Sequence, residues 1–178
     1  VMGVMANVFY IDQGFTKDQI AGVSKIFGLI MTLLGAGMGG LLIVRFGILP
    51  ILFIGGVASA GTNLLFVMLA DMGPDLQMLI FTISLDNFSS GLATSAFVAY
   101  LSSLTNLKFS ATQYALLSSI MLLLPRLIGG YSGVMVEKFG YHNFFLITCM
   151  LGVPTLLLIA LHWFQENRRI RLNPPQED

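Results

Sequence analysis

The sequence predicts an all-α integral membrane protein, and three observations support this fold class. Of its 178 residues 56% are hydrophobic and only 10% are charged, whereas soluble proteins carry roughly 25% charged residues. The mean hydropathy is +0.83. The apolar residues form continuous runs long enough for helices of about 20 residues to cross roughly 30 Å of hydrocarbon. Barrel strands would be about 9–11 residues long with alternating polarity, so helices are expected.

Six helices are expected in order along the chain. The apolar run at about residues 1–11 is too short to cross a bilayer, and the chain starts with Val rather than with Met and a basic segment. We therefore interpret it as the end of a truncated span in a fragment of a longer protein. Whole spans follow at about 18–44, 49–70, 76–104, 111–136 and 143–164, and the polar residues 165–178 form a tail.

The basic residues of the connections predict the orientation of these spans, because Lys and Arg concentrate in cytoplasmic loops. A cytoplasmic C-terminus leaves only Lys17 and Lys138 on the outer side. We therefore expect a multi-pass membrane protein with its C-terminus in the cytoplasm. The basic residues on the inner side would then be Arg45, Lys108, Arg168, Arg169 and Arg171.

Composition and motifs exclude several function classes. Nine basic and nine acidic residues cancel, which leaves no basic surface for nucleic acid. Cys149 is the single cysteine, so a Cys-rich metal site is excluded. His142 and His162 flank the last span on opposite sides of the membrane and cannot serve one active site. We therefore expect no metal, no cofactor and no enzymatic activity.

The stretch Gly35-Ala-Gly37-Met-Gly39-Gly40 matches the G-x-G-x-x-G pattern of dinucleotide sites. That fingerprint requires a preceding strand and a following helix, and here the glycines lie near the end of a long apolar helix. Small residues at such spacing favour close packing of membrane helices. The glycines are therefore expected to serve helix packing.

An internal repeat relates the two halves of the chain. A shift of 94 residues aligns residues 15–21 with 109–115, including Gln19 with Gln113, and 24–35 with 118–129. After one gap, residues 40–47 align with 133–140, so that Phe46-Gly47 lies over Phe139-Gly140. The period is three helices long. Since an odd number of spans inverts the second copy, the chain is expected to contain two inverted three-helix repeats.

Inverted three-helix repeats build each six-helix half of the major facilitator superfamily of transporters. The segment Gly40-Leu-Leu-Ile-Val-Arg45-Phe46-Gly47 resembles a degenerate form of the loop motif of that superfamily, with the acid missing. We therefore expect a half-transporter whose first helix is truncated. Gly40, Arg45 and Gly47 would form its gating loop.

Three ionisable residues lie inside the expected spans: Lys25, Asp86 and Arg126. Each costs about 2.5–3.5 kcal/mol at a helix centre and should face a partner or a wet cavity. At 1.5 Å per residue, Lys25 lies roughly 10 Å from the outer end of its helix, and the other two roughly 15 Å from theirs. Two alternatives follow: a purely structural ion pair of Asp86 with Arg126 or Lys25, or a substrate and proton site. With two bases and one acid, the second alternative favours an anionic substrate.

The helix around Asp86 carries many polar residues and is therefore expected to line a polar space. Asn87 follows Asp86 directly and is a candidate ligand for substrate. Tyr10, on the truncated helix, is a second candidate. The other polar residues of this helix are Thr82, Ser84, Ser89 and Ser90.

Several stretches resemble the anhydromuropeptide permease (AmpG-type) family of the major facilitator superfamily. The resemblance spans nearly the whole chain, as the C-terminal half of a permease. It departs from the family pattern at Asp86, where Glu is more common, at Pro125 before the Arg, and in the tail. The stretches that carry it are 94–102, 108–119, Ser24-Lys25-Ile-Phe-Gly-Leu, Leu85-Asp86-Asn87, Arg126 and Phe139-Gly140.

The resemblance implies proton-driven import of anionic anhydromuropeptides across the bacterial inner membrane during peptidoglycan recycling. Lys25 falls at the intramembrane Lys of the family, and with Arg126 it would attract substrate carboxylates, while Asp86 would exchange a proton. The missing N-terminal half would complete the cavity. Two alternatives stay open: transport of another organic anion such as an acyl-CoA, and a non-transport membrane subunit.

Overall fold

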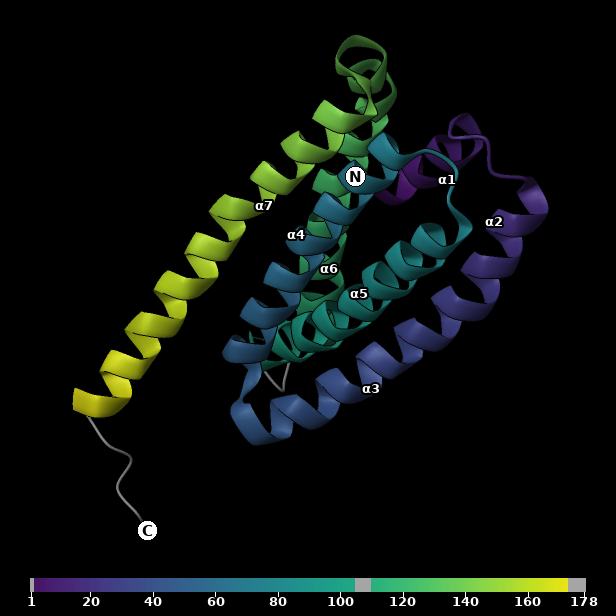
Figure 1. The fold of residues 1–178 in the computed structure, drawn as a ribbon. Coiled ribbons are helices and arrows are strands. Elements are labelled where there is room, and N and C mark those ends of the chain that lie inside the picture. Colours follow the sequence, from purple (N-terminus) through teal and green to yellow (C-terminus); the bar gives the residue numbers. More distant parts are fainter. Residues whose placement is uncertain (1, 105–109, 173–178) are drawn as a thin grey trace.

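A computed structural model describes residues 2–104 and 110–172. Within these residues the protein is helical and contains no strand (Figure 1). Among the residues described, three segments are long and apolar enough to cross a membrane by length and composition: Lys17–Phe46, Ile48–Met72 and Ser132–Gln165.

The helices follow one another with short connections. The first long segment comprises α2 and α3 joined by a π-helical turn, η1, without a break. The elements are α1 (Met2–Asp12), α2 (Lys17–Val23), η1 (Ser24–Gly28), α3 (Leu29–Phe46), α4 (Ile48–Met72), α5 (Leu76–Leu104), α6 (Ser110–Gly130) and α7 (Ser132–Leu172).

Local chemistry explains where several helices begin. Thr16 and Gln19 form a reciprocal capping box at the start of α2, which pairs two otherwise unbonded backbone N–H groups. The carboxylate of Asp75 accepts from the backbone N–H groups of Gln77 and Met78 at the start of α5. Gly47 has φ 87° between α3 and α4, a backbone conformation that glycine adopts without a steric penalty.

The expected helix at residues 111–136 is divided in the structure. It ends as α6 at Gly130, Tyr131 forms a turn, and α7 begins at Ser132. Two consecutive glycines weaken the helix before the break. The Ser132 hydroxyl donates to the Gly129 carbonyl over 2.5 Å, a bond that competes with the regular helical ladder.

The backbone supports the internal repeat. Within α7 the helix is interrupted at Gly140, with φ 74° and ψ 167°, and Gly47 has φ 87° and ψ 170°. These two glycines are the last aligned residues of the two repeats. The same sharp turn therefore follows the second helix of each three-helix repeat, as expected for duplicated units.

We name the two ends of the helix bundle after the glycines in their turns (Figure 1). The Gly73 end holds the start of α2, the α4–α5 turn and Gly140 of α7. The Gly47 end holds the α3–α4 turn and the far end of α7. At the Gly73 end, the Tyr141 hydroxyl donates to the Asp12 carboxylate, and His142 Nδ1 lies 3.0 Å from an Asp71 oxygen. These contacts tie α7 to α1 and α4.

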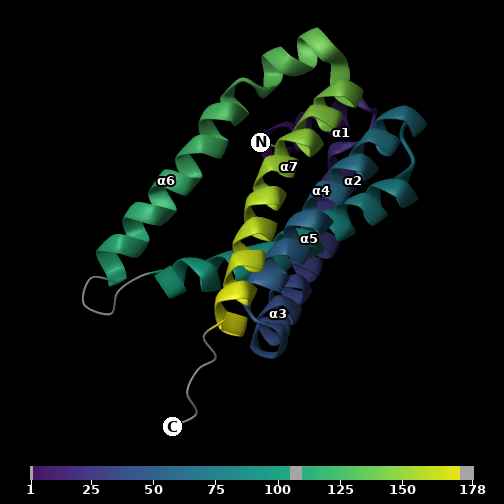
Figure 2. The same ribbon diagram turned by 90° about the vertical axis from the view of Figure 1, so that its left-hand side faces the viewer.

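Helices α3, α4 and α5 pack against one another, and α7 lies along α4, whereas α6 contacts α5 and α7 but stands away from α3 and α4 in Figure 2. Glycines bring α3 and α5 together. A Cβ added to Gly35 would lie 2.1 Å from the Phe88 carbonyl oxygen, and one added to Gly91 would lie 2.2 Å from that of Thr32. The expectation of glycine-mediated packing is confirmed at Gly35 and also at Gly39, where a Cβ would lie 2.1 Å from the Ser95 hydroxyl oxygen.

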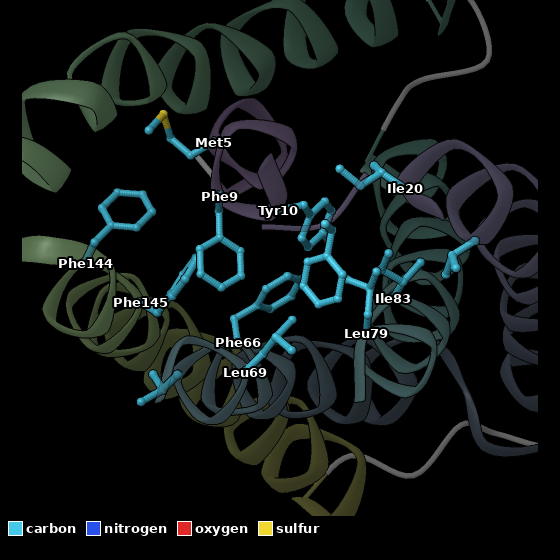
Figure 3. Packing of buried hydrophobic residues seen from close by; sticks show 13 residues of the cluster. Met5, Phe9, Tyr10, Ile20, Phe66, Leu69, Leu79, Ile83, Phe144 and Phe145 are labelled. Atoms are coloured by element: carbon cyan, nitrogen blue, oxygen red, sulfur yellow. The ribbon is translucent and has the colours of Figure 1, made fainter. Parts of the chain in front are cut away.

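An aromatic cluster fills the core at the Gly73 end (Figure 3). The Phe9 ring of α1 lies 4.9 Å from that of Phe145 in an edge-to-face arrangement and 6.3 Å from that of Phe66. All three side chains are buried. Such pairs add to the free energy of burial, so the short helix α1 is anchored between α4 and α7.

Candidate functional site

Asp86 lies in the middle of α5, half-buried between helices. The Thr62 hydroxyl of α4 donates to its Oδ1 over 2.9 Å, and the same hydroxyl lies 2.8 Å from the Ser59 carbonyl oxygen. Thr62 is 1% exposed. The carboxylate is therefore held in a fixed position by a neighbouring helix.

Asn87 lies in the contact between α5 and α3. Its Oδ1 accepts from the Thr32 hydroxyl over 3.1 Å, and its Nδ2 donates to the Ile83 carbonyl over 2.8 Å. The same hydroxyl oxygen also lies 2.8 Å from the Gly28 carbonyl oxygen. These bonds give Asn87 a role in joining α3 to α5, next to the Asp86 carboxylate.

Tyr10 lies close enough to Asp86 for the two groups to interact electrostatically. It is 5% exposed and belongs to the aromatic cluster, where its ring stacks on Phe66 at 6.3 Å (Figure 3). The structure thus brings three of the predicted site residues, Tyr10, Asp86 and Asn87, into one region between α1, α3, α4 and α5.

Thr82 adds a polar group to this region. Among the side chains that the structure describes, its hydroxyl is fully buried and has no hydrogen-bond partner. An unsatisfied buried hydroxyl costs about 1–3 kcal/mol. Thr82 precedes Asp86 by one helical turn and lies on the same face of α5, so this face retains hydrogen-bonding capacity for a ligand, a water or a proton.

Lys25 lies in the π-helical turn η1 and is exposed. π-Helical turns inside α-helices are frequent at functional sites. Its side chain lines a cavity of about 300 Å³ with Asn7 of α1 and Lys17 of α2. The sequence predicted Lys25 as a site residue and did not single out Lys17.

Arg126 lies on α6 and is exposed. Helix α6 contacts α5 and α7 but stands away from α3 and α4 (Figure 2), so Arg126 is not part of the region that α3, α4 and α5 form around Asp86. In the described part of the chain, Asp86 forms no ion pair with Lys25 or Arg126. The structural ion pair that the sequence left open as an alternative is therefore not formed in this conformation.

The predicted gating loop lies at the Gly47 end. Gly40 and Arg45 are exposed near the end of α3, and Gly47 makes the turn into α4. The Arg45 guanidinium lies over the Phe46 ring, 5.5 Å from its centroid, a favourable cation–π geometry. No acidic partner for Arg45 is present among the residues described, in line with the missing acid of the motif.

Sequence reasoning missed Thr62 and Thr32, which bind the Asp86 and Asn87 side chains. The only signal in the sequence was a polar residue within an apolar run. Lys108, predicted as an inner basic residue, lies outside the described residues.

The comparison with known families decides the architecture. A family model described as Major Facilitator Superfamily matches residues 1–178. The chain belongs to the major facilitator superfamily. It is therefore a multi-pass membrane protein of a transporter family, and the helical fold of the described residues fits the fragment of a facilitator transporter that the sequence predicted.

Relatives in Rickettsia carry the transporter name AmpG. AmpG 4 of Rickettsia conorii is 38% identical over 159 residues, which is 89% of this chain and 38% of that protein. AmpG 1 of Rickettsia felis is 34% identical over 159 residues, 89% of this chain and 36% of that protein. AmpG 3 of Rickettsia prowazekii is 33% identical over 172 residues, 93% of this chain and 41% of that protein.

The chain thus spans about two fifths of the length of these relatives. The facilitator family and the AmpG-type similarity agree with the expectation from the sequence. The superfamily consists of transporters rather than enzymes, and its members move small solutes across membranes.

Proposed function

We propose that this chain is the C-terminal half of a proton-coupled transporter that imports anionic muropeptides across the bacterial inner membrane. The observation that carries the proposal is the Asp86 carboxylate, which lies within an apolar helix bundle, accepts a bond from Thr62 and has no basic partner among the described residues. The similarity to proteins named AmpG supports the choice of substrate.

Asp86 is proposed to carry the proton. A carboxylate inside a membrane protein is costly when charged and much less costly when neutral. Protonation at Asp86 therefore changes the energetic balance between conformations that expose it to water and conformations that bury it. The Thr62 bond keeps the carboxyl group in place in α5 while this exchange occurs.

Substrate binding is assigned to Lys25, Arg126, Asn87 and Tyr10. Lys25 and Arg126 supply positive charge, and both are exposed on this half, so that the N-terminal half of the same transporter can complete a cavity around them. Asn87 and Tyr10 lie beside Asp86 and would couple the binding of substrate to the protonation of Asp86. Two cations around one acid favour a ligand with several carboxylates.

Gly40, Arg45 and Gly47 are proposed to act at the cytoplasmic gate. Gly47 provides a turn that other residues adopt only with strain, since its φ is 87°. In this orientation Arg45 and Arg168 face the cytoplasm, as does the C-terminus, in agreement with the preference of basic residues for that side.

Uptake of labelled anhydromuropeptide tests the proposal. The full reading frame is expressed in cells that lack their own permease, with and without a protonophore. We expect uptake that the protonophore abolishes. Competition with unlabelled acyl-CoA tests the other anion class. Absence of muropeptide uptake from cells with confirmed membrane insertion would contradict the proposed substrate, and uptake unaffected by the protonophore would contradict proton coupling.

Replacing Thr62 with valine is expected to lower the transport rate about tenfold. The substitution removes the only hydroxyl that donates to Asp86 in the described region, and hydrogen bonds to charged groups contribute about 1.5–3 kcal/mol. Thr62→Ser keeps the hydroxyl and should restore most of the rate. Initial uptake rates normalised to the amount of protein in the membrane provide the measurement. Equal rates in the valine and serine variants would contradict this role.

A further inference from the structure

A cavity of about 300 Å³ between α1 and the α2–η1 segment is lined by two lysines. Lys17 begins α2 at the Gly73 end, and Lys25 lies in η1. They are eight residues apart, or about 12 Å along the helix axis. The cavity therefore presents two positive charges in a row that runs from the end of the bundle toward its middle.

Neither lysine forms an ion pair with an acid in the described part of the chain. The residues that line the cavity include no Asp or Glu. Of the nearest acids in sequence, Asp12 accepts the Tyr141 hydroxyl at the α1–α7 contact, and Asp18 is exposed on α2. The two ammonium groups are thus available to an anion.

The rest of the cavity suits a ligand that is charged only at its ends. Asn7 and Ser24 contribute hydrogen-bonding groups, whereas Ile11, Ile20 and Ala21 are apolar. Apolar walls lower the local dielectric constant, which strengthens the attraction between an ammonium group and a carboxylate. The π-helical turn changes the direction of the side chains that follow α2, and it carries both Ser24 and Lys25.

We propose that this cavity is a subsite for an elongated dianion, in which one carboxylate binds Lys17 and a second binds Lys25. The inference rests on the proposed function for the identity of the transported solute, and it adds Lys17 as a residue that determines specificity. Because Lys17 lies at the end of the bundle, it would also attract the anion first as the anion enters.

Uptake kinetics of the full-length transporter test the role of Lys17. We compare labelled anhydromuropeptide with free peptide carboxylates and the same compound with amidated carboxylates. Lys17→Gln should raise KM for the free acid about tenfold, the effect of losing one charge-assisted bond, and should leave the maximal rate within about twofold. KM for the amidated compound should not change.

Matched variants make the result specific. Lys138→Gln removes an exposed lysine of α7 that does not line the cavity and should leave both KM values unchanged. Lys17→Arg keeps the charge and should restore KM for the free acid. An equal change of KM for both compounds, or no change in Lys17→Gln, would overturn the subsite.

Protection from an amine-reactive reagent separates the subsite from the proposed substrate. The purified full-length transporter is labelled with and without anhydromuropeptide or acyl-CoA, and modification of each lysine is measured by mass spectrometry. Protection of Lys17 and Lys25, but not Lys138, by anhydromuropeptide supports the subsite and the proposed function together. Protection by acyl-CoA alone supports the subsite and contradicts the muropeptide substrate. If neither anion protects the two lysines, the subsite is overturned. The proposed function is then tested by the uptake assay alone.

Discussion

Replacing Asp86 with asparagine is expected to abolish accumulation of substrate against a gradient. Asparagine has nearly the shape of aspartate, and its side-chain oxygen can still accept from Thr62, so the fold and the contact between α4 and α5 should persist. The amide cannot take up and release a proton at physiological pH. Since one pH unit corresponds to about a tenfold ratio of concentrations, loss of coupling should lower accumulation at least about tenfold.

Accumulation ratios in energised cells, together with direct binding to the purified transporter, measure this effect. Binding should be retained while accumulation is lost. Asp18→Asn is the matched control, because Asp18 is an exposed carboxylate on α2 and its loss should leave accumulation unchanged. Unaltered accumulation in the Asp86→Asn variant would remove Asp86 from the proton-coupling role.

Replacing Gly91 with alanine is expected to destabilise the half-bundle strongly. The new Cβ would lie 2.2 Å from the Thr32 carbonyl oxygen and 2.9 Å from the Ala36 nitrogen. Both are backbone atoms of α3 and cannot move independently of the helix. Overpacking of this kind typically costs 1–3 kcal/mol and occasionally more. The displacement of α3 would also strain the Thr32–Asn87 bond beside the candidate site.

Gly37→Ala serves as the control for helix propensity. Gly37 is an exposed residue of the same helix, α3, and a Cβ there would meet no atom within 4 Å. Since alanine favours helix over glycine by about 1 kcal/mol, this variant should be as stable as the native transporter or more stable. The apparent Tm in detergent and the monodisperse fraction compare the two. A Tm of Gly91→Ala equal to that of Gly37→Ala would contradict the packing argument.

Most of the helices were predictable because helix formation in a membrane depends on the local sequence. An apolar run of sufficient length forms a helix in a membrane, since each backbone group must be satisfied within its own segment. The sequence therefore placed the run at 76–104 where α5 extends from Leu76 to Leu104. The break at Tyr131 was not foreseen, because it depends on a side-chain bond from Ser132 within a continuously apolar stretch.

The candidate site was predictable only in part. Asp86 stood out because an ionisable group in an apolar run is rare and costly. Its partner Thr62 was not predictable, because a threonine in a membrane helix can also form a hydrogen bond to the backbone of its own helix. The shared cavity of Lys17 and Lys25 was not predictable from the sequence either, because it forms only where α1 packs beside α2.

By itself, the sequence determined the membrane class, the helical segments, the inverted repeat and the resemblance to a transporter family. These properties follow from the composition, from the length of the apolar runs and from the similarity between two stretches of the chain. None of them depends on how the helices pack. The tertiary structure decided that Asp86 binds Thr62 rather than Lys25 or Arg126, and that Gly35 and Gly91 bring α3 against α5. Such pairings depend on the rotation and spacing of helices, which are fixed only when side chains from distant parts of the chain pack together.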